Sequence, residues 1–71
     1  MAESVYKVIE LIGTSTESWE KAASAALDRA SAKLRDLRIA EVAQLDITIG
    51  EKGEHTYRAK VNVSFKYEDG D

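Results

Sequence analysis

The chain is too short to bury a large hydrophobic core, and it lacks the cross-links that usually stabilise proteins of this size. A domain of 71 residues buries only about 60% of the surface that its unfolded form exposes. Such domains are commonly completed by disulfides, a structural metal or association with other chains. With no cysteine and one histidine, disulfides are excluded and a zinc core is disfavoured. We therefore expect one domain over residues 1–71 that assembles with copies of itself.

The charge and hydropathy of the chain narrow the classes of partner. Ten basic and 13 acidic residues are mixed along the sequence and give a net charge of −3, so no overall basic field would attract DNA or RNA. No segment approaches the roughly 18 apolar residues of a membrane-spanning helix, and the start of the chain lacks a signal-peptide pattern. We expect no nucleic-acid partner, no membrane partner and a cytoplasmic location, with residues 68–71 as a frayed acidic tail.

The first half of the chain predicts a strand followed by a helix. Residues 5–12 are rich in β-branched side chains and are followed by Gly13, which predicts a strand that ends at the glycine. Thr14 and Glu17 have the spacing of a capping box, which would open a helix directly after the strand. From Trp19 to Leu37 apolar residues recur in steps of three and four, which predicts an amphipathic helix of about five turns. Its apolar stripe is mostly alanine, so the core should be thin.

The second half predicts two paired strands. Ala43, Leu45, Ile47 and Ile49 alternate with Val42, Gln44, Asp46 and Thr48, the period of two that is typical of a strand. After a polar turn over residues 50–54, apolar side chains alternate with polar ones from Tyr57 to Tyr67. A strand of about twelve residues is roughly twice the average length, so we expect it to reach beyond its own subunit. The order of elements predicts a βαββ fold.

This sequence resembles the dodecin family over nearly its whole length. The motifs that carry the resemblance are Val5-Tyr6-Lys7-Val8-Ile9-Glu10, Gly13-Thr14-Ser15, Ala40-Glu41-Val42, Thr56-Tyr57 and Val61-Asn62-Val63-Ser64-Phe65. The resemblance implies an α+β fold in which a three-stranded antiparallel sheet wraps around one helix, assembled into a hollow homododecamer. It also implies a non-catalytic role in binding, storing or buffering a small ligand. Most known dodecins bind flavins (FMN, riboflavin or FAD), and some bind coenzyme A or metal ions.

The resemblance identifies two cofactor-binding positions. In flavin-binding dodecins a Trp stacks on the isoalloxazine ring and a Gln hydrogen-bonds to it, and these positions are Ile39 and Arg58 here. Losing the aromatic plane removes on the order of 1 kcal/mol beyond area burial, and a guanidinium can only donate hydrogen bonds. Ile39 together with Arg58 resembles instead a Trp-less branch of the family, for which calcium is the implied ligand.

Three carboxylates are candidate metal ligands, because calcium takes six to eight oxygens and accepts them from several chains around a symmetry axis. They are Asp46, Glu41 and Glu10. Arg58 projects from the last strand and could hold an anion, but an ion pair with one of these carboxylates is the favoured interpretation.

Other residues that invite a functional interpretation have a structural one that is favoured. Trp19 lies on the apolar stripe of the predicted helix and is interpreted as a packing residue. His55 has no second His or Cys nearby for a metal or a catalytic pair, and is interpreted as an exposed turn residue. Because no motif places a base beside a nucleophile, we expect no enzyme activity. The alternatives left open are a flavin-binding shell, a metal-binding shell and a purely structural assembly.

Overall fold

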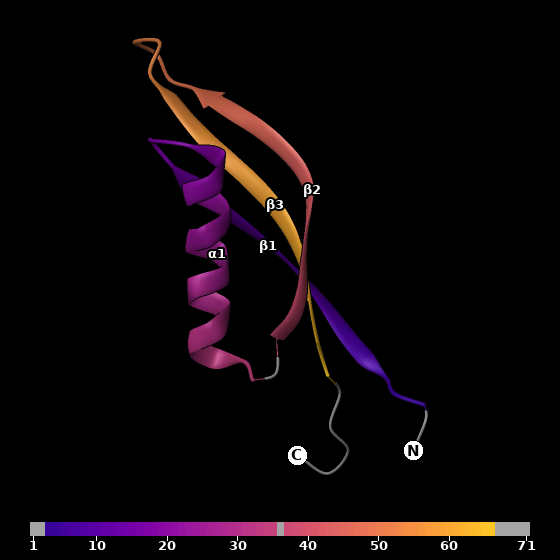
Figure 1. Cartoon of the computed structure of the whole chain (residues 1–71). Helices are drawn as coiled ribbons and strands as arrows, with labels where there is room; N and C mark the ends of the chain where they lie inside the picture. Colours follow the sequence, from indigo (N-terminus) through magenta and orange to yellow (C-terminus); the bar gives the residue numbers. More distant parts are fainter. Residues whose placement is uncertain (1–2, 36, 67–71) are drawn as a thin grey trace.

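The computed structural model describes residues 3–35 and 37–66, in which one helix packs on a three-stranded antiparallel sheet (Figure 1). The elements in chain order are β1 (Tyr6–Ser15), α1 (Trp19–Lys33), β2 (Leu37–Ile49) and β3 (His55–Lys66). The strand order is β1-β3-β2, so the last strand lies in the centre and pairs with both others. This arrangement confirms the predicted βαββ fold and the pairing of the last two strands. The predicted tail, residues 68–71, lies outside the described residues.

The first strand does not end at Gly13, as the sequence predicted, but continues to Ser15. Gly13 pairs with Ala59 of β3 and is buried beneath α1. A methyl group at this position would overlap the backbone carbonyl oxygen of Ala22 in the helix. The glycine is therefore a point of close approach between helix and strand, and not a strand terminator.

The predicted capping box at Thr14 and Glu17 is wrong, because Thr14 still belongs to β1. Ser18 is the N-cap, and its side-chain oxygen accepts a hydrogen bond of 3.0 Å from the backbone N–H of Lys21. The backbone N–H of Glu17 instead donates to the hydroxyl of Ser15. The N-cap thus lies four residues further along the chain than predicted, because β1 continues through Thr14 to Ser15.

The helix is also shorter than predicted. It has 15 residues, which is about four turns, and its C-cap Leu34 already has an extended backbone. Leu37, which the helical spacing included, is the first residue of β2 and packs against the core from there. The spacing of leucines continues beyond the helix because both elements bury residues in the same core.

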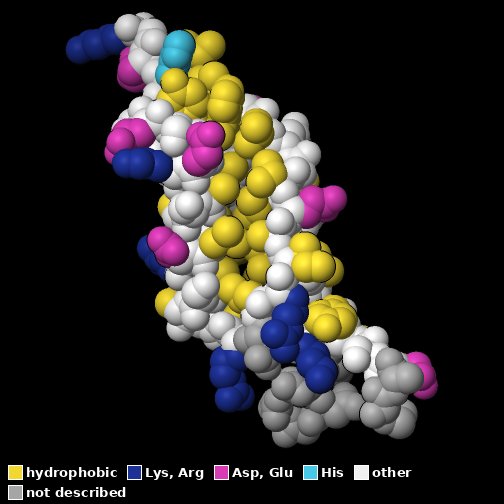
Figure 2. Space-filling model, in the orientation of Figure 1, with side chains coloured by type: hydrophobic (Ala, Val, Ile, Leu, Met, Phe, Trp, Pro, Cys, Tyr) yellow, Lys and Arg dark blue, Asp and Glu magenta, His cyan; other side chains and the backbone are white. Residues whose placement is uncertain are grey.

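The core is thin, as expected. Its buried apolar residues in the described part of the chain are only alanines and valines, namely Ala22, Ala26, Ala30, Ala59, Val61 and Val63. Ile9, Leu11, Leu27 and Leu37 pack partly buried against this core. Nine other large apolar side chains are exposed, namely Val5, Tyr6, Val8, Ile12, Ile39, Val42, Leu45, Ile47 and Ile49. Figure 2 shows hydrophobic side chains in a long band along the molecule. A single subunit therefore leaves most of its large apolar groups unburied.

Strand β2 extends past the helix and leaves apolar side chains uncovered. Leu45 and Ile47 pair with Ala59 and Tyr57 of β3, so they point to the side of the sheet on which the helix lies, yet they are 47% and 37% exposed. The subunit measures 55 × 20 × 15 Å. Its radius of gyration is 14.8 Å, against about 11 Å for a compact domain of this length. The subunit is therefore extended rather than compact. No helix among the described residues is long and apolar enough to span a bilayer.

One face assignment within β2 is wrong. The alternation placed Val42 with Gln44 and Asp46, but Val42 pairs with Val61, a core residue of β3. A register shift between Val42 and Gln44 inserts an extra residue there. Such a bulge changes the side to which the following residues point, so Val42 and Leu45 share the helix side.

Replacing Gly13 with alanine should destabilise the fold, because the new methyl group forces α1 away from β1. We expect a loss of about 1–3 kcal/mol, the usual range for overpacking a core, measured by denaturant unfolding at fixed protein concentration. Gly53→Ala is the matched control. Gly53 has a positive φ of 84° with nothing within 4 Å of the added methyl group, so its cost is about 1 kcal/mol of backbone strain. Equal losses in both variants would contradict the close-approach role of Gly13.

Replacing Leu45 with lysine should weaken assembly, because a charge would replace an apolar side chain that copies of the chain are expected to cover. Burying one leucine is worth about 1.5–3 kcal/mol, and the loss is repeated in every subunit. Sedimentation velocity at micromolar concentration should show smaller species than for the wild type. Thr48→Lys, at an exposed polar position of the same strand, should keep the wild-type mass. An unchanged mass for the Leu45 variant would refute this role.

Candidate ligand-binding face

The side of the sheet that faces away from α1 is here called the open face. Along β3, the residues Ala59, Val61 and Val63 are buried beneath the helix. The residues between them and on either side of them therefore point to the open face, because side chains alternate along a strand. They are Arg58, Lys60, Asn62 and Ser64. Their partners on the neighbouring strands share this face.

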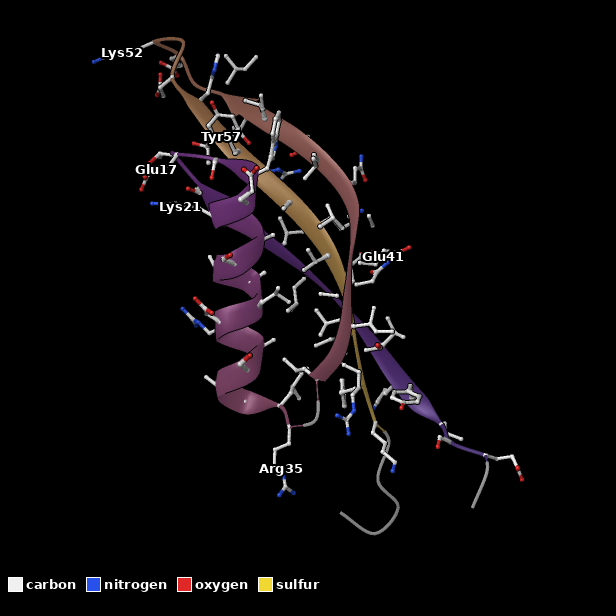
Figure 3. All side chains as sticks on the ribbon, in the orientation of Figure 1. Glu17, Lys21, Arg35, Glu41, Lys52 and Tyr57 are labelled. Atoms are coloured by element: carbon white, nitrogen blue, oxygen red, sulfur yellow. The ribbon has the colours of Figure 1, made fainter. Side chains whose placement is uncertain are left out.

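All five candidate site residues lie on the open face. Glu10 and Glu41 pair with Asn62 from opposite sides, Ile39 pairs with Ser64, and Asp46 pairs with Arg58. In Figure 3 the side chain of Glu41 projects from β2 away from the helix. The structure thus places on one surface residues that the sequence distributes over three strands.

Arg58 and Asp46 form a bidentate ion pair. Arg58 Nε donates to Asp46 Oδ1 at 2.7 Å, and Arg58 Nη2 donates to Oδ2 at 2.9 Å. The two side chains are 42% and 43% exposed, so solvent screens the pair and its effect on stability is small. Its geometric effect is larger, because two parallel bonds fix the plane of the guanidinium. The ion-pair interpretation of Arg58 is confirmed.

Asp46 also connects the open face to the helix. Its backbone carbonyl oxygen accepts a hydrogen bond of 3.1 Å from Trp19 Nε1 at the start of α1. The Trp19 ring packs edge-on against Tyr57, with 5.2 Å between the ring centroids and 75° between the planes, a favoured geometry for aromatic pairs. Trp19 is therefore a packing residue, as interpreted from the sequence. Tyr57 lies on the helix side of β3 (Figure 3).

The ion pair changes the acidity of both partners. The hydrogen bond from Arg58 holds the pKa of Asp46 below its usual value, against a smaller opposing effect of desolvation, and the charges of Arg58 and Lys60 lower it further. The same hydrogen bond raises the pKa of the Arg58 guanidinium. Both groups are therefore charged over the physiological range of pH.

The three candidate metal ligands are not brought together within one subunit. Glu41 accepts a hydrogen bond of 3.4 Å from the side-chain amide of Asn62, and Glu10 lies on the other side of the same asparagine. Asp46 lies level with Arg58. Arg58 is four residues from Asn62 along β3, so Asp46 is about 13 Å from the two glutamates. Within residues 3–35 and 37–66, no three His, Cys, Asp or Glu side chains are grouped as a metal site. His55 is exposed, as expected, but it is not a turn residue, because it is the first residue of β3 and pairs with Ile49 of β2.

The two positions predicted to bind a cofactor, Ile39 and Arg58, are also far apart. Ile39 is 67% exposed and lies level with Ser64, whose hydroxyl donates to the Ile39 carbonyl oxygen at 3.4 Å. Ser64 lies six positions from Arg58 along β3, which corresponds to about 20 Å. One small ligand cannot touch both side chains in a single subunit. A ligand that contacts Ile39 and Arg58 together must lie between subunits.

Sequence reasoning did not identify a groove on the other side of the sheet. It has a volume of about 500 Å³ and lies between α1 and the β1 edge, with Leu11, Ala26 and Ala30 among its lining residues and Arg29 and Lys33 from the helix also lining it. The signal in the sequence is the alanine stripe of the helix, which leaves space where larger side chains would fill it. The groove adds to the apolar surface that a single subunit leaves uncovered.

An open βαββ subunit with a thin core and a polar sheet face defines a class of small subunits that are completed by assembly. The chain belongs to the dodecin family, whose model, "Dodecin", matches residues 5–68. Dodecins are non-catalytic binding proteins, so the expectation of no enzyme activity is confirmed by the family. The family also implies a homo-oligomer that binds small ligands.

Known relatives cover almost the whole chain. The sequence is 51% identical to calcium dodecin of Mycobacterium tuberculosis over 63 residues, which is 89% of each chain. It is 46% identical to dodecin of Thermus thermophilus over 65 residues, 92% of this chain and 94% of that protein. The structure matches crystalline M. tuberculosis calcium dodecin with a TM-score of 0.87, 47% identity, and coverage of 96% of this chain and 97% of that one. That protein is described as calcium-chelating, with a novel calcium-binding site.

The Asp46–Arg58 pair should contribute to the pH dependence of the free energy of unfolding only at acidic pH. Because the folded pKa of Asp46 is lowered, the pair stabilises the fold fully above the unfolded value of about 3.9, and this contribution disappears as pH falls through the lower folded value. The difference in Tm between wild type and Asp46→Asn should be constant from about pH 7 to 5 and shrink below about pH 4. Asp46→Asn combined with Arg58→Gln is the control, which should follow Asp46→Asn. A difference that grows in acid would contradict the pairing.

Proposed function

We propose that this chain forms a homo-oligomeric dodecin shell, with twelve subunits as implied by the resemblance, that binds and buffers calcium and has no flavin function. The observation that carries the proposal is the state of the two flavin-contacting positions. Ile39 offers no aromatic ring for stacking, and the Arg58 guanidinium is already bound by both oxygens of Asp46. The similarity to calcium dodecin over 89% of both chains supports calcium as the ligand. Coenzyme A has no support from these relatives.

The carboxylates best suited to calcium are Glu10 and Glu41. They flank Asn62 on the open face, and carboxylate and amide oxygens are ligands that calcium prefers. Asp46 is less suited, because calcium would have to displace Arg58 from both of its oxygens. One subunit supplies fewer than the six to eight oxygens that calcium takes. We therefore infer that a second subunit or bound water completes the site. We also propose that the shell acts in the cytoplasm.

Calorimetric titration of the assembled protein tests this function. Calcium should bind to the wild type, and Glu10→Gln and Glu41→Gln should each weaken binding by about tenfold or more, because each removes a charged ligand oxygen. Asp46→Asn is the matched control, and should bind calcium like the wild type. Riboflavin fluorescence should stay unquenched when the protein is added.

Two results would count against the proposal. If calcium produced no heat and no shift in Tm while riboflavin were quenched, the flavin-binding alternative would hold instead. If neither ligand bound or raised Tm by mass action, the assembly would be purely structural.

A further inference from the structure

The open face has a cationic end that only one acidic residue neutralises. A β3 residue and its paired neighbours on β1 and β2 are here called a row of the sheet. The row of Arg58 contains Thr14 and Asp46, and the row of Lys60 contains Ile12 and Gln44. Among the residues of these two rows, Asp46 is the only carboxylate. The carboxylates of Glu10 and Glu41 lie in the next row, level with Asn62. The local charge of the two rows is therefore +1 with Asp46 and +2 without it.

We propose that Asp46 is a specificity-determining residue, which occupies the Arg58 guanidinium as an internal anion and so excludes phosphate groups from the open face. The inference rests on the proposed function, because it concerns the class of ligand that the same face selects. Cations remain acceptable at Glu10 and Glu41, while the Nε and Nη2 donors that form one bidentate fork of Arg58 are already engaged by Asp46.

The geometry of the pair supports this role. The guanidinium fork binds carboxylate and phosphate in the same bidentate way, and both of the donors that Asp46 engages, Nε and Nη2, belong to such a fork. A tethered carboxylate acts at an effective concentration on the order of millimolar or above, so free phosphate at lower concentration competes poorly with it.

Lys60 would join an anion that replaced the carboxylate. It lies two residues from Arg58 on the same face of β3, and its charge acts on Asp46 in the folded protein. An anion in the place of the Asp46 side chain would therefore meet two positive charges. Exposure of 42% for the Arg58 side chain leaves it accessible to such an anion.

Substitution of Asp46 can release Arg58 without removing the attachment of the helix. Trp19 Nε1 donates to the backbone carbonyl of Asp46, and every substitution retains this group. Asp46→Ala removes both acceptor oxygens, and Asp46→Asn removes the charge while keeping the shape. The two variants together separate an effect of the freed donors from an effect of altered packing.

The experiment is a calorimetric titration of the assembled protein with inorganic pyrophosphate. Wild type should bind weakly, whereas Asp46→Ala should bind at least about tenfold more tightly, because a charge-assisted bidentate contact becomes available. Asp46→Asn should gain affinity in the same direction. Adding Arg58→Gln to Asp46→Ala should abolish the gain. Glu41→Gln is the matched control, since it removes one negative charge from the same face, level with a residue four positions from Arg58 along β3, and it should gain little.

A parallel titration with FMN and riboflavin, which differ by one phosphate, tells a phosphate-bearing cofactor from a free anion. Asp46→Ala should gain affinity for pyrophosphate, and any gain for FMN should exceed that for riboflavin. The proposal is overturned if Asp46→Ala gains no affinity for pyrophosphate, if the gain persists without Arg58, if Glu41→Gln gains as much, or if riboflavin gains equally. Calcium titrations of the wild type test the proposed function separately, because failure to bind calcium leaves the pyrophosphate comparison readable.

Discussion

The close approach of α1 to the sheet is the constraint on which the rest of the structure depends. It requires Gly13 beneath Ala22, where any side chain would meet the helix backbone, and the fully buried apolar residues of the described chain are only alanine and valine. Small side chains bring the layers together but bury little apolar area, and buried area is the main source of stability. The exposed large apolar residues belong to the two edge strands, β1 and β2, or directly precede β1. Assembly is therefore a consequence of how tightly the two layers pack within one subunit.

The central position of β3 divides the work between the two faces of the sheet. Its alternate residues form the floor of the core on one side and the polar open face on the other, as shown by Val61 beneath the helix and Asn62 between two glutamates. Asp46 connects the faces, because its side chain holds Arg58 while its backbone carbonyl holds Trp19. A structural change at Asp46 on the open face is thus close to the start of α1. The contact between Trp19 and Tyr57 should respond to such a change.

Sequence patterns predicted the elements better than their limits. The alternation of β3 and the alanine stripe of α1 gave the fold class and the thin core, because both patterns reflect burial on one face. The end of β1 was misplaced because a glycine has the same local signal whether it stops a strand or admits a helix backbone, and only the packing at Ala22 distinguishes the two. The face of Val42 was misplaced because a bulge shifts the register of β2, and alternation alone carries no sign of an inserted residue. The candidate site residues were placed on a common face only by this register, which pairs Asp46 with Arg58.

The distances along β3 link ligand binding to assembly. Ile39 and Arg58 lie about 20 Å apart in one subunit, and the two carboxylates that flank Asn62 in one subunit are too few for a complete calcium shell. Any ligand that uses these residues fully must therefore draw on more than one copy of the chain. By mass action such a ligand stabilises the assembled state over the free subunit, and the thin core makes that contribution large relative to what a subunit can supply alone. A bound ligand would thus stabilise the sheet at its polar face, and neighbouring subunits would stabilise it by covering the exposed apolar residues of the edge strands.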